Sequence, residues 1–538
     1  MFRRRDAEAR TRTWDHLVNS EALYQLSYFG RHQPVPRFDS SGFRFVATQS
    51  GVGPDGRPTT EKVVVRALER YSMTSDAPAT DDLAATLATV RERTTPSSAE
   101  RDRLVGVTAD LRERAAAAVA DLPGPADEAD VLQVGSTARG TWLPGDRDVD
   151  LFVRFPTALD RDELEQFGLR VGHTVLPDGV EEFAEHPYVR GSHEGFDVDL
   201  VPCFDIETAT DGRTAVDRTP FHTAYLERVL DDDLAADVRV FKQFLTAVGA
   251  YGSDLRTRGF SGYLTELLVA EHDGLEPLLR AATDWQPPVR FDPEDHGTAT
   301  FDDALVVIDP TDPERNVAAV CAAENVARLQ HHARRLVADP DPDRFRPREP
   351  TALDAAGVRD HLDDRGTDPV AVDFRAPAVV DDQLYPQLRR SLAGIERELD
   401  DRGFDVFRTA TFAAPHDGDE PRRAVLVFEL ASRTIPAVER HQGPPVHVGD
   451  HAAGFYDSYA ESESCGPFLD GDRYVVERDR PYRDAATFLR ETGFSEIALG
   501  AQIESALADG YTVHAGTGVA DLAEPFGTDL QEYFEPRV

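Results

Sequence analysis

Residues 131–155 read VLQVGSTARGTWLPGDRDVDLFVRF, and most of what can be predicted about this chain starts from them. The pattern predicts a strand, then a turn with a short helix, then a second strand. Because side chains alternate between the two faces of a strand, Asp148 and Asp150 point the same way, and Val149 points to the opposite face. Two carboxylates on one face make a poor core and a good site for hard divalent cations, which prefer oxygen ligands.

A second pair of aspartates lies in GFDVDLVPCF (195–204), which also reads as a strand. If this strand lies beside the first, Asp148, Asp150 and Asp199 form a set of three carboxylates that can hold two Mg²⁺ ions for phosphoryl chemistry. Asp197 stays outside this catalytic and metal-binding set, as a supporting acid or a solvent-facing residue. D-x-D is common in so acidic a chain, so the prediction depends on the combination of the two strands.

Gly135 and Ser136 complement the aspartates. A glycine lets the backbone come close to a phosphate, and the short helix that follows offers free N–H groups to an anion. The Ser136 hydroxyl and Arg139, one turn further on, could both reach a triphosphate. Gly-Ser after a strand is also a common turn, and that alternative stays open for this pair taken alone.

The charge composition of the chain indicates the salt concentration in which the protein works. Its 538 residues include 98 acidic and 58 basic ones, for a net charge of −40, and Lys62 and Lys242 are the only lysines. Taken alone, this balance argues against nucleic acid as a partner, because binding a polyanion needs local positive charge. An acidic, lysine-poor surface also suits molar salt, where repulsion is screened beyond ~3 Å. We therefore interpret the composition as that of a halophile.

The remaining composition indicates a cytoplasmic protein. No apolar stretch approaches the length of a membrane span, and the N-terminus lacks the apolar run of a secretory signal. The three cysteines, Cys203, Cys321 and Cys465, have no paired spacing, which disfavours a disulfide framework or a zinc site.

Several stretches resemble a known family. The GS…DxD arrangement resembles the polymerase-beta nucleotidyltransferase superfamily. Further stretches resemble archaeal (class I) tRNA CCA-adding enzymes, namely VGSTARGTWLPG, AEHPYVRG with FDVDLVPCF, AVDRTPFH, FKQFLTAVGAYGSDLRTRGFSGYLTELLV, DPTDPERNVAA, RHQGPPV and CGPFLDGDRYVVERDR. The similarity covers roughly residues 80–490 and leaves 1–72 outside.

The resemblance implies roles for individual residues. Asp148, Asp150 and Asp199 match the catalytic metal-binding carboxylates, although the first is often Glu in the family. Arg315 matches a residue implicated in reading the incoming base. The full set of implied nucleotide contacts is Ser136, Arg139, Thr219, His222, Lys242, Tyr251 and Arg315.

Structural interpretations compete with several of these roles. Thr219 before proline also reads as a helix N-cap, and His222 could be a core histidine. Tyr251 could merely cover a helix-ending turn, and Arg315 could cap a helix. Lys242 has an argument of its own, because a chain that has replaced nearly all its lysines keeps this one. A compact ammonium approaches a phosphate as a point charge, and a planar guanidinium does not replace it without loss.

The resemblance and the patterns together predict an α+β multidomain protein. Residues 1–72 carry a net charge of +4 and the remainder −44, so we expect an atypical N-terminal extension, either disordered or a mis-called start. We expect a nucleotidyltransferase head with a mixed sheet at 78–215 and a central helical domain that binds nucleotide and tRNA at 216–340. A C-terminal, tRNA-binding α/β region of ferredoxin or RNA-recognition type is expected at 350–538.

Local patterns predict individual elements within these regions. We expect helices at 80–121 with a break near 95–96, at 162–176, over most of 215–270 and at 385–403, strands at 405–412 and 424–430, and a linker at 338–350.

The implied activity is template-independent addition of C, C and A to a tRNA 3′ end from CTP and ATP, with Mg²⁺ as cofactor and release of pyrophosphate. The implied partners are the tRNA acceptor end, ATP and CTP. We expect no association with a membrane, and a homodimer is left open. Arginine clusters at 314–319, 328–335 and 440–446 are candidates for RNA contact. The alternatives are a poly(A)- or oligoadenylate-type polymerase and an inactive RNA-binding protein.

Overall fold

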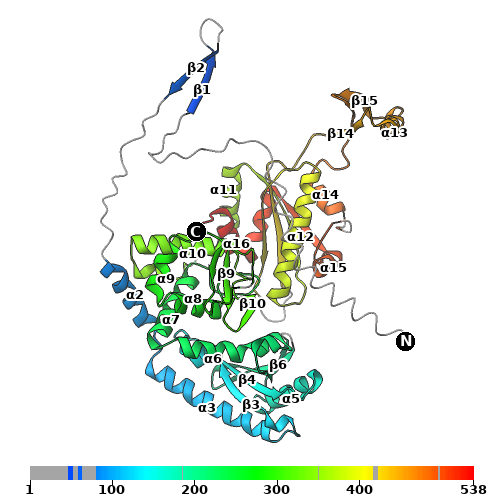
Figure 1. The fold of residues 1–538 in the computed structure, drawn as a ribbon. Helices are drawn as coiled ribbons and strands as arrows, with labels where there is room; N and C mark the ends of the chain where they lie inside the picture. The colour runs from blue at the N-terminus through cyan, green and yellow to red at the C-terminus, as the bar shows by residue number, and fades with distance from the viewer. Residues whose placement is uncertain are drawn as a thin grey trace, which may run out of the picture. The chain divides into compact units, whose positions relative to one another are not determined.

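The computed structural model describes residues 47–52, 58–63 and 80–538, except for 184–185, 298, 349, 416–421, 493 and 495–496. The chain divides into two compact units, Met1–Ser75 and Asp76–Val538. In the first unit, strands β1 (Ala47–Val52) and β2 (Pro58–Val63) pair antiparallel (Figure 1). The rest of the predicted extension 1–72 lies outside the described residues, so its character stays a prediction.

A five-stranded sheet with the order β3-β4-β7-β6-β5 forms the head of the second unit (Figure 1). Strands β4 and β7 pair in parallel, and the other neighbours pair antiparallel. The strands are β3 (Asp130–Val134), β4 (Asp148–Pro156), β5 (Val180–Phe183), β6 (Pro187–His193) and β7 (Phe196–Asp205).

Helices α3 (Ser98–Ala120) and α5 (Arg161–Val175) pack on this sheet and share its hydrophobic core. Each begins with a capping box, because Ser97 and Asp160 accept hydrogen bonds from backbone N–H groups that would otherwise lack partners. The break predicted near 95–96 and the helix predicted at 162–176 are confirmed. The sequence did not predict strands β5 and β6.

Helices build the central part of the second unit. They are α6 (Thr219–Val229), α7 (Asp232–Ala247), α8 (Gly262–Glu271), α9 (Leu275–Ala282) and α10 (Ala323–Ala338). A small sheet of order β10-β9-β8 joins them, with β8 (Val289–Phe291), β9 (Leu305–Asp309) and β10 (Asp312–Asn316). Ser261 caps α8 by accepting a hydrogen bond from the N–H of Leu264 at 3.0 Å, and the helix begins at the next residue.

Two segments differ from expectation at the edges of this part. Helix α2 (Thr80–Thr94) packs Leu83 and Val90 into the central core, although its position in the chain suggested the head. The stretch 338–350 is not a free linker, because its 3₁₀ turn places Phe345 in the same core and Gln243 donates to the Phe345 carbonyl at 2.8 Å. Burial of the Phe345 ring holds this segment against the core, although the residues around it are mostly polar. The domain boundaries themselves stay predictions.

The C-terminal part contains an antiparallel sheet of order β12-β13-β11-β17 with helices on both faces. Alternate residues of β11 and β13 enter the two cores, as period-2 alternation requires. The succession strand, helix, strand, strand, helices, strand supports the expected ferredoxin-type region. Its elements are α11 (Ala355–Arg365), β11 (Asp368–Arg375), α12 (Asp381–Asp401), β12 (Val406–Ala413), β13 (Arg423–Leu430), α14 (Ala485–Glu491), α15 (Ala501–Asp509), β17 (Tyr511–Ala515) and α16 (Ala523–Phe534).

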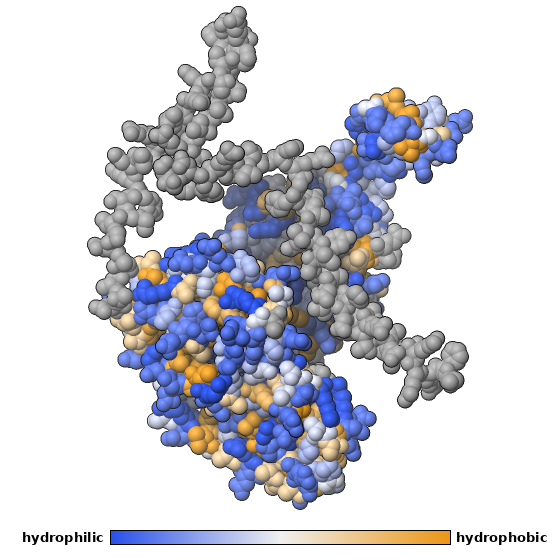
Figure 2. Space-filling model, viewed as in Figure 1, coloured by the Kyte–Doolittle hydropathy of each residue, from blue (hydrophilic) through white to orange (hydrophobic). Residues whose placement is uncertain are grey.

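A separate three-stranded sheet of order β14-β16-β15 lies between β13 and α14 in the chain. Its elements are β14 (Val438–Pro445), α13 (Gly449–Tyr459), β15 (Cys465–Asp470) and β16 (Arg473–Asp479). The predicted α+β class is confirmed. Hydrophilic residues cover most of the visible face, as the acidic composition predicts (Figure 2). Among the described residues no helix is both long and apolar enough to span a bilayer.

Candidate active site

Strands β4 and β7 bring the predicted catalytic aspartates to neighbouring positions. The two strands pair in parallel, with Asp148 opposite Asp197 and Asp150 opposite Asp199. Val149 between them is buried in the head core, so the aspartates project from the other side. Adjacent strands lie about 4.8 Å apart, which puts the carboxylates of Asp150 and Asp199 on one small patch. The strand adjacency expected from the sequence is therefore present.

Burial and mutual repulsion make these carboxylates hard to ionise. Burial, followed by the charges of Asp199 and Asp148, raises the pKa of Asp150 to about 6. Burial also raises the pKa of Asp148, and the charges of Asp146 and Asp197 add to that rise. Burial likewise raises the pKa of Asp199. A cation among these groups would relieve their repulsion and favour the charged forms.

One carboxylate oxygen supports a metal at this patch. Asp199 Oδ1 is buried and accepts no hydrogen bond from the described residues, although it forms an ion pair with Nε of Arg190 at 3.5 Å. Within the described part of the chain, no three His, Cys, Asp or Glu side chains converge closely enough to hold a metal alone. Mg²⁺ commonly takes one or two carboxylates and completes its shell with water and substrate phosphates. The aspartate patch fits that mode of binding.

The turn after β3 presses Gly135 against Asp150. Gly135 has φ +77°, and a Cβ at this position would lie 2.0 Å from Oδ2 of Asp150. Both the backbone conformation and the space therefore require glycine. Ser136 follows in helix α4 (Gly135–Arg139) and is half-buried. The predicted Gly-Ser element thus lies directly beside the aspartates.

A buried glutamate that the sequence analysis missed holds Arg139. Nε and Nη2 of Arg139 donate to Oε1 and Oε2 of Glu266 at 3.1 and 2.8 Å, and Nη1 donates to Oγ1 of Thr223 at 3.3 Å. Glu266 lies on α8 and is fully buried. The charge of Arg139 also opposes the rise in the pKa of Asp150, so the guanidinium lies within the field of the aspartate patch. The bidentate pair fixes the direction of this arginine.

Lys242 and Tyr251 meet beneath the turn that follows α4. The Nζ of Lys242 donates to the carbonyl oxygen of Thr141 at 2.9 Å, and the side chain is 3% exposed. Burial lowers the pKa of Lys242, against the attraction of nearby Glu266. A Cβ at Gly262 would lie 3.4 Å from the Tyr251 hydroxyl and 3.8 Å from Lys242 Nζ, so both side chains cover this glycine. The ammonium is a buried internal charge here.

His222 and Arg315 converge on one carboxylate, that of Asp309. His222 Nε2 lies 2.9 Å and Arg315 Nη1 lies 2.7 Å from the Oδ2 of Asp309. The imidazole of His222 also stacks on Tyr263 with ring centroids 4.1 Å apart. Two residues predicted separately as nucleotide contacts are thus brought together. The acid that joins them carried no predicted role.

Thr219 is a helical residue of α6, three positions before His222. Its φ of −57° and ψ of −40° are helical, and a 3₁₀ turn (Ala215–Arg218) runs directly into the helix. The alternative interpretation of Thr219 as an N-cap is therefore wrong, because an N-cap residue has an extended backbone.

Helices α6 and α8 connect the two groups of predicted contacts. Arg139 reaches Thr223 on α6 and Glu266 on α8. His222 on α6 and Tyr263 on α8 reach towards Asp309. Each helix carries one residue of each group within three positions. Arg139 and the Asp309 carboxylate are therefore held by the same two helices.

Arginines of two predicted RNA-contact clusters have protein partners. Arg328 pairs with Glu324 at 3.0 Å, and Arg334 donates to the carbonyl oxygen of Thr283 at 2.7 Å. Arg440 pairs with Asp470 at 2.9 Å. Contact with RNA stays a prediction for these clusters.

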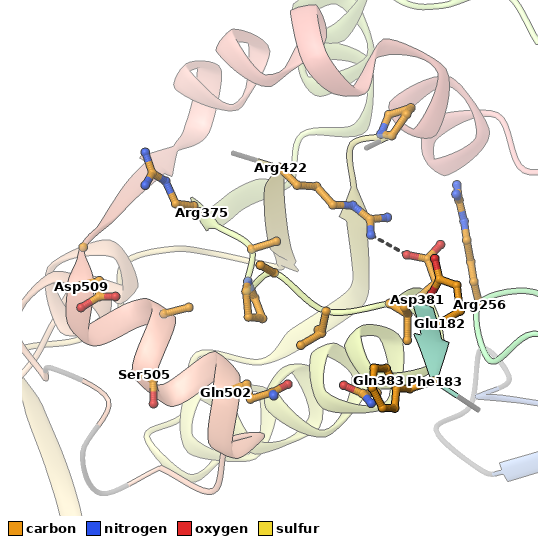
Figure 3. Close-up of a pocket in the computed structure, with 18 residues that line it drawn as sticks. Glu182, Phe183, Arg256, Arg375, Asp381, Gln383, Arg422, Gln502, Ser505 and Asp509 are labelled. Atoms are coloured by element: carbon orange, nitrogen blue, oxygen red, sulfur yellow. Dashed lines mark hydrogen bonds and ion pairs between the residues drawn. The ribbon is translucent and has the colours of Figure 1, made fainter. Parts of the chain in front are cut away.

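A cavity of about 1570 Å³ opens beside β5, β11, α12 and α15, and none of the predicted site residues lines it (Figure 3). Arg422 pairs with Asp381 within it, and Arg256 and Arg375 also line it. Phe183 on β5 is 73% exposed there. Glu182, Asp381 and Asp509 also line the cavity, so its acidic side chains balance its arginines in number.

Three family models match successive parts of the chain. The model described as a nucleotidyltransferase domain matches residues 113–222. The second domain of tRNA nucleotidyltransferase matches residues 236–346, and the C-terminal domain of the CCA-adding enzyme matches residues 365–516.

Curated relatives share most of their length with this chain, and those described here are named CCA-adding enzyme. The protein from Halorubrum lacusprofundi is 59% identical over 463 residues, which cover 85% of this chain and 99% of the relative. The protein from Haloarcula marismortui is 56% identical over 466 residues, with the same shares covered. The protein from Methanosarcina acetivorans is 36% identical over 440 residues, covering 81% of this chain and 95% of the relative.

Proposed function

The chain belongs to the family of CCA-adding enzymes and is a tRNA nucleotidyltransferase, and we propose that its reaction takes place at the aspartate patch of β4 and β7. The 3′-hydroxyl oxygen of the tRNA attacks the α-phosphorus of CTP or ATP and its proton passes to solvent. One O–P bond forms, the P–O bond to the β-phosphate breaks, and pyrophosphate leaves. Successive reaction cycles add C, C and A without a nucleic-acid template. The observation that carries this proposal is the register that sets Asp150 beside Asp199, with Asp148 two residues away.

Nucleotidyltransferases of this kind generally work with a divalent metal, and we propose Mg²⁺ here. When bound, Mg²⁺ lowers the pKa of the attacking hydroxyl and offsets charge on the triphosphate. Asp148, Asp150 and Asp199 supply the oxygen ligands. The bare backbone at Gly135 leaves room for the Asp150 carboxylate, and we propose that Ser136, the next residue, donates to a phosphate oxygen.

The remaining predicted residues act on the nucleotide from two directions. We propose that Arg139, Lys242 and Tyr251 place positive charge and a hydroxyl near the triphosphate. Thr219, His222 and Arg315 contact the nucleoside, with Arg315 reading the base. Support comes from contacts within the first set through Glu266 and Gly262, and from the contacts of His222 and Arg315 with Asp309. Thr219 lies three residues before His222 on α6.

The RNA partner in this proposal is the acceptor end of tRNA in the cytoplasm. At a net charge of −40 and in molar salt, counterion release contributes little to affinity, so shape and stacking must carry recognition. Phe183, Arg256 and Arg375 in the cavity of Figure 3 offer stacking and phosphate contacts. A homodimer stays a prediction that sedimentation in molar KCl would test.

Nucleotide incorporation tests the proposed reaction. The protein is incubated in molar KCl with tRNA that lacks its CCA end, and with CTP alone, ATP alone, or both. We expect two C residues from CTP alone, completion with A when both are present, and no addition from ATP alone. Open-ended tailing by ATP would contradict the proposal and favour a poly(A)-type polymerase.

Substitution tests the proposed ligands. Asp150→Asn is expected to lower the rate of CTP addition by roughly a thousandfold or more, since several kcal/mol of charge stabilisation are lost. Asp197→Asn is the matched control, because Asp197 lies on the same pair of strands outside the proposed set. Full activity in Asp150→Asn would remove the aspartate patch from the mechanism and place the reaction at a different site.

A further inference from the structure

The Asp309 carboxylate is held by donors from several elements. Its Oδ2 lies 2.9 Å from Nε2 of His222 on α6 and 2.7 Å from Nη1 of Arg315 on β10. Its Oδ1 accepts from the N–H and hydroxyl of Thr311 at 2.9 and 2.8 Å and from the hydroxyl of Tyr263 on α8 at 3.3 Å. Side chains from two helices, one strand and the loop between β9 and β10 thus contact this one carboxylate.

Exposure falls steeply from the arginine to the acid. The Arg315 side chain is 38% exposed and that of His222 is 15% exposed, while Asp309 is fully buried beneath both. Burial alone would raise the pKa of Asp309, but hydrogen bonds from His222, Thr311 and Arg315 outweigh burial and hold that pKa well below its usual range. Asp309 is therefore an acceptor, and we assign the proton on His222 to Nε2.

This arrangement fixes the plane of the Arg315 guanidinium. Asp309 is the only hydrogen-bond partner of Arg315 within the described part of the chain, and it engages Nη1 alone. The other guanidinium nitrogens stay available to a ligand as donors of fixed direction. An arginine can donate and cannot accept, so it distinguishes partners by where they present acceptors.

Cytosine and adenine share a feature that such a donor can read. Both place a ring-nitrogen acceptor beside an amino group on the Watson–Crick edge, whereas uracil and guanine place a ring N–H beside a carbonyl. A fixed donor that meets the N–H leaves two polar groups unpaired, and sites built on directed hydrogen bonds reject such mismatches strongly.

We propose that Asp309 is a positioning residue for base selection: it holds Arg315 and His222 so that the guanidinium accepts CTP and ATP and rejects UTP and GTP. This inference rests on the proposed function. Asp309 does not touch the nucleotide, and its effect passes through Arg315. Loss of the carboxylate frees the guanidinium, and the discrimination between bases falls even where the protein still transfers nucleotides.

Asp309→Asn tests this inference, with Asp312→Asn as the matched control. Asp312 is a nearby buried acid that pairs with Arg218 at 3.2 Å, so the control removes a comparable charge without touching His222 or Arg315. We expect Asp309→Asn to lower the ratio of kcat/KM for CTP over UTP by about tenfold or more, and Asp312→Asn to leave it unchanged. A loss of CTP and UTP incorporation by the same factor is what a merely structural role predicts, and it would overturn the proposal.

A double-mutant cycle then tests whether Asp309 acts through Arg315. Adding Asp309→Asn to Arg315→Ala should cause no further loss of the CTP-over-UTP ratio, because the group that Asp309 positions is already gone. A further loss as large as that in the wild-type background would show an independent effect and contradict the proposal.

A surface variant keeps the test informative if the buried change prevents folding. Arg315→Lys retains a positive partner for Asp309 and lacks the planar fork, so the ratio should fall without loss of stability. An unchanged ratio would overturn the proposal. The wild-type control separates two failures: wild-type protein that adds no CTP counts against the proposed function, whereas normal selectivity in the variants counts only against this inference.

Discussion

The backbone of Gly135 lies so close to the carboxylate of Asp150 that a Cβ there would be 2.0 Å from Oδ2. Five residues on, Gly140 has a similar φ, +70° against +77°, but a Cβ at Gly140 would meet nothing within 4 Å. The two ends of α4 therefore offer a matched pair. One glycine is needed for its conformation alone, and the other also for the space that it leaves to a proposed metal ligand.

Gly135→Ala is expected to lower the rate of CTP addition by about a hundredfold, because the methyl group must displace the Asp150 carboxylate and a misplaced catalytic group costs this much. Gly140→Ala should cost only the strain of a left-handed backbone, about 1–2 kcal/mol of stability, and keep its activity. Single-turnover incorporation and urea unfolding, both in molar KCl, measure the two effects. Equal activity in the two variants would show that Asp150 does not need its present position.

Glu266→Gln should destabilise the protein by about 3–5 kcal/mol, because removal of one partner leaves the charge of Arg139 buried and uncompensated. Glu276→Gln is the control, since Glu276 pairs with Arg280 on a partly exposed surface of α9, where such a change costs under about 1 kcal/mol. Urea unfolding monitored by tryptophan fluorescence gives both values. Similar small losses in the two variants would mean that water reaches the Arg139–Glu266 pair.

Lys242→Arg is expected to lower both nucleotide affinity and turnover. The planar guanidinium is larger than the ammonium and cannot occupy a site that is 3% exposed without moving the Thr141 carbonyl. Arg228→Lys makes the reverse exchange at the surface, where Arg228 pairs with Glu294, and should change neither quantity. If CTP binding and incorporation are the same in Lys242→Arg as in wild type, the retention of this lysine has no functional cause.

The melting midpoint should rise as KCl is raised from about 0.1 M to about 1 M, where the screening length falls from about 10 Å to about 3 Å. A net charge of −40 repels itself most when it is unscreened, so the folded state gains from added salt. Circular dichroism melts across this range measure the effect. A midpoint that rises on removal of KCl would contradict the interpretation of the composition as halophilic.

The sequence predicted well wherever the argument was local. Alternation along 148–150 and 197–199 predicted which carboxylates share a face. The pairing of the two strands was only a condition of the prediction, and the structure meets it. The break near 95–96 and the helix at 162–176 were likewise predicted from signals contained within a few residues.

The residues for which the sequence predicted no role, Glu266 and Asp309, are linked to the site through partners far away in the chain. Glu266 stands in an apolar helix, LTELLV, and its partner Arg139 lies 127 positions away in the chain. Asp309 ends the run ALVVID and joins His222, 87 positions away, to Arg315. An acid enclosed by apolar neighbours was the available signal for both, since buried carboxylates need partners. Which partners they have depends on how α6 and α8 pack, and spacing alone does not contain that information.

The Glu266 and Asp309 carboxylates are fully buried, so dissolved salt screens their ion pairs with Arg139 and Arg315 much less than it screens exposed charges. The stability of the exposed acidic surface depends on the salt concentration, whereas that of these buried ion pairs depends on it far less. On transfer to dilute buffer we therefore expect the exposed acidic surface to be destabilised first. The buried pairs of Glu266 with Arg139 and of Asp309 with Arg315 should be the last to separate.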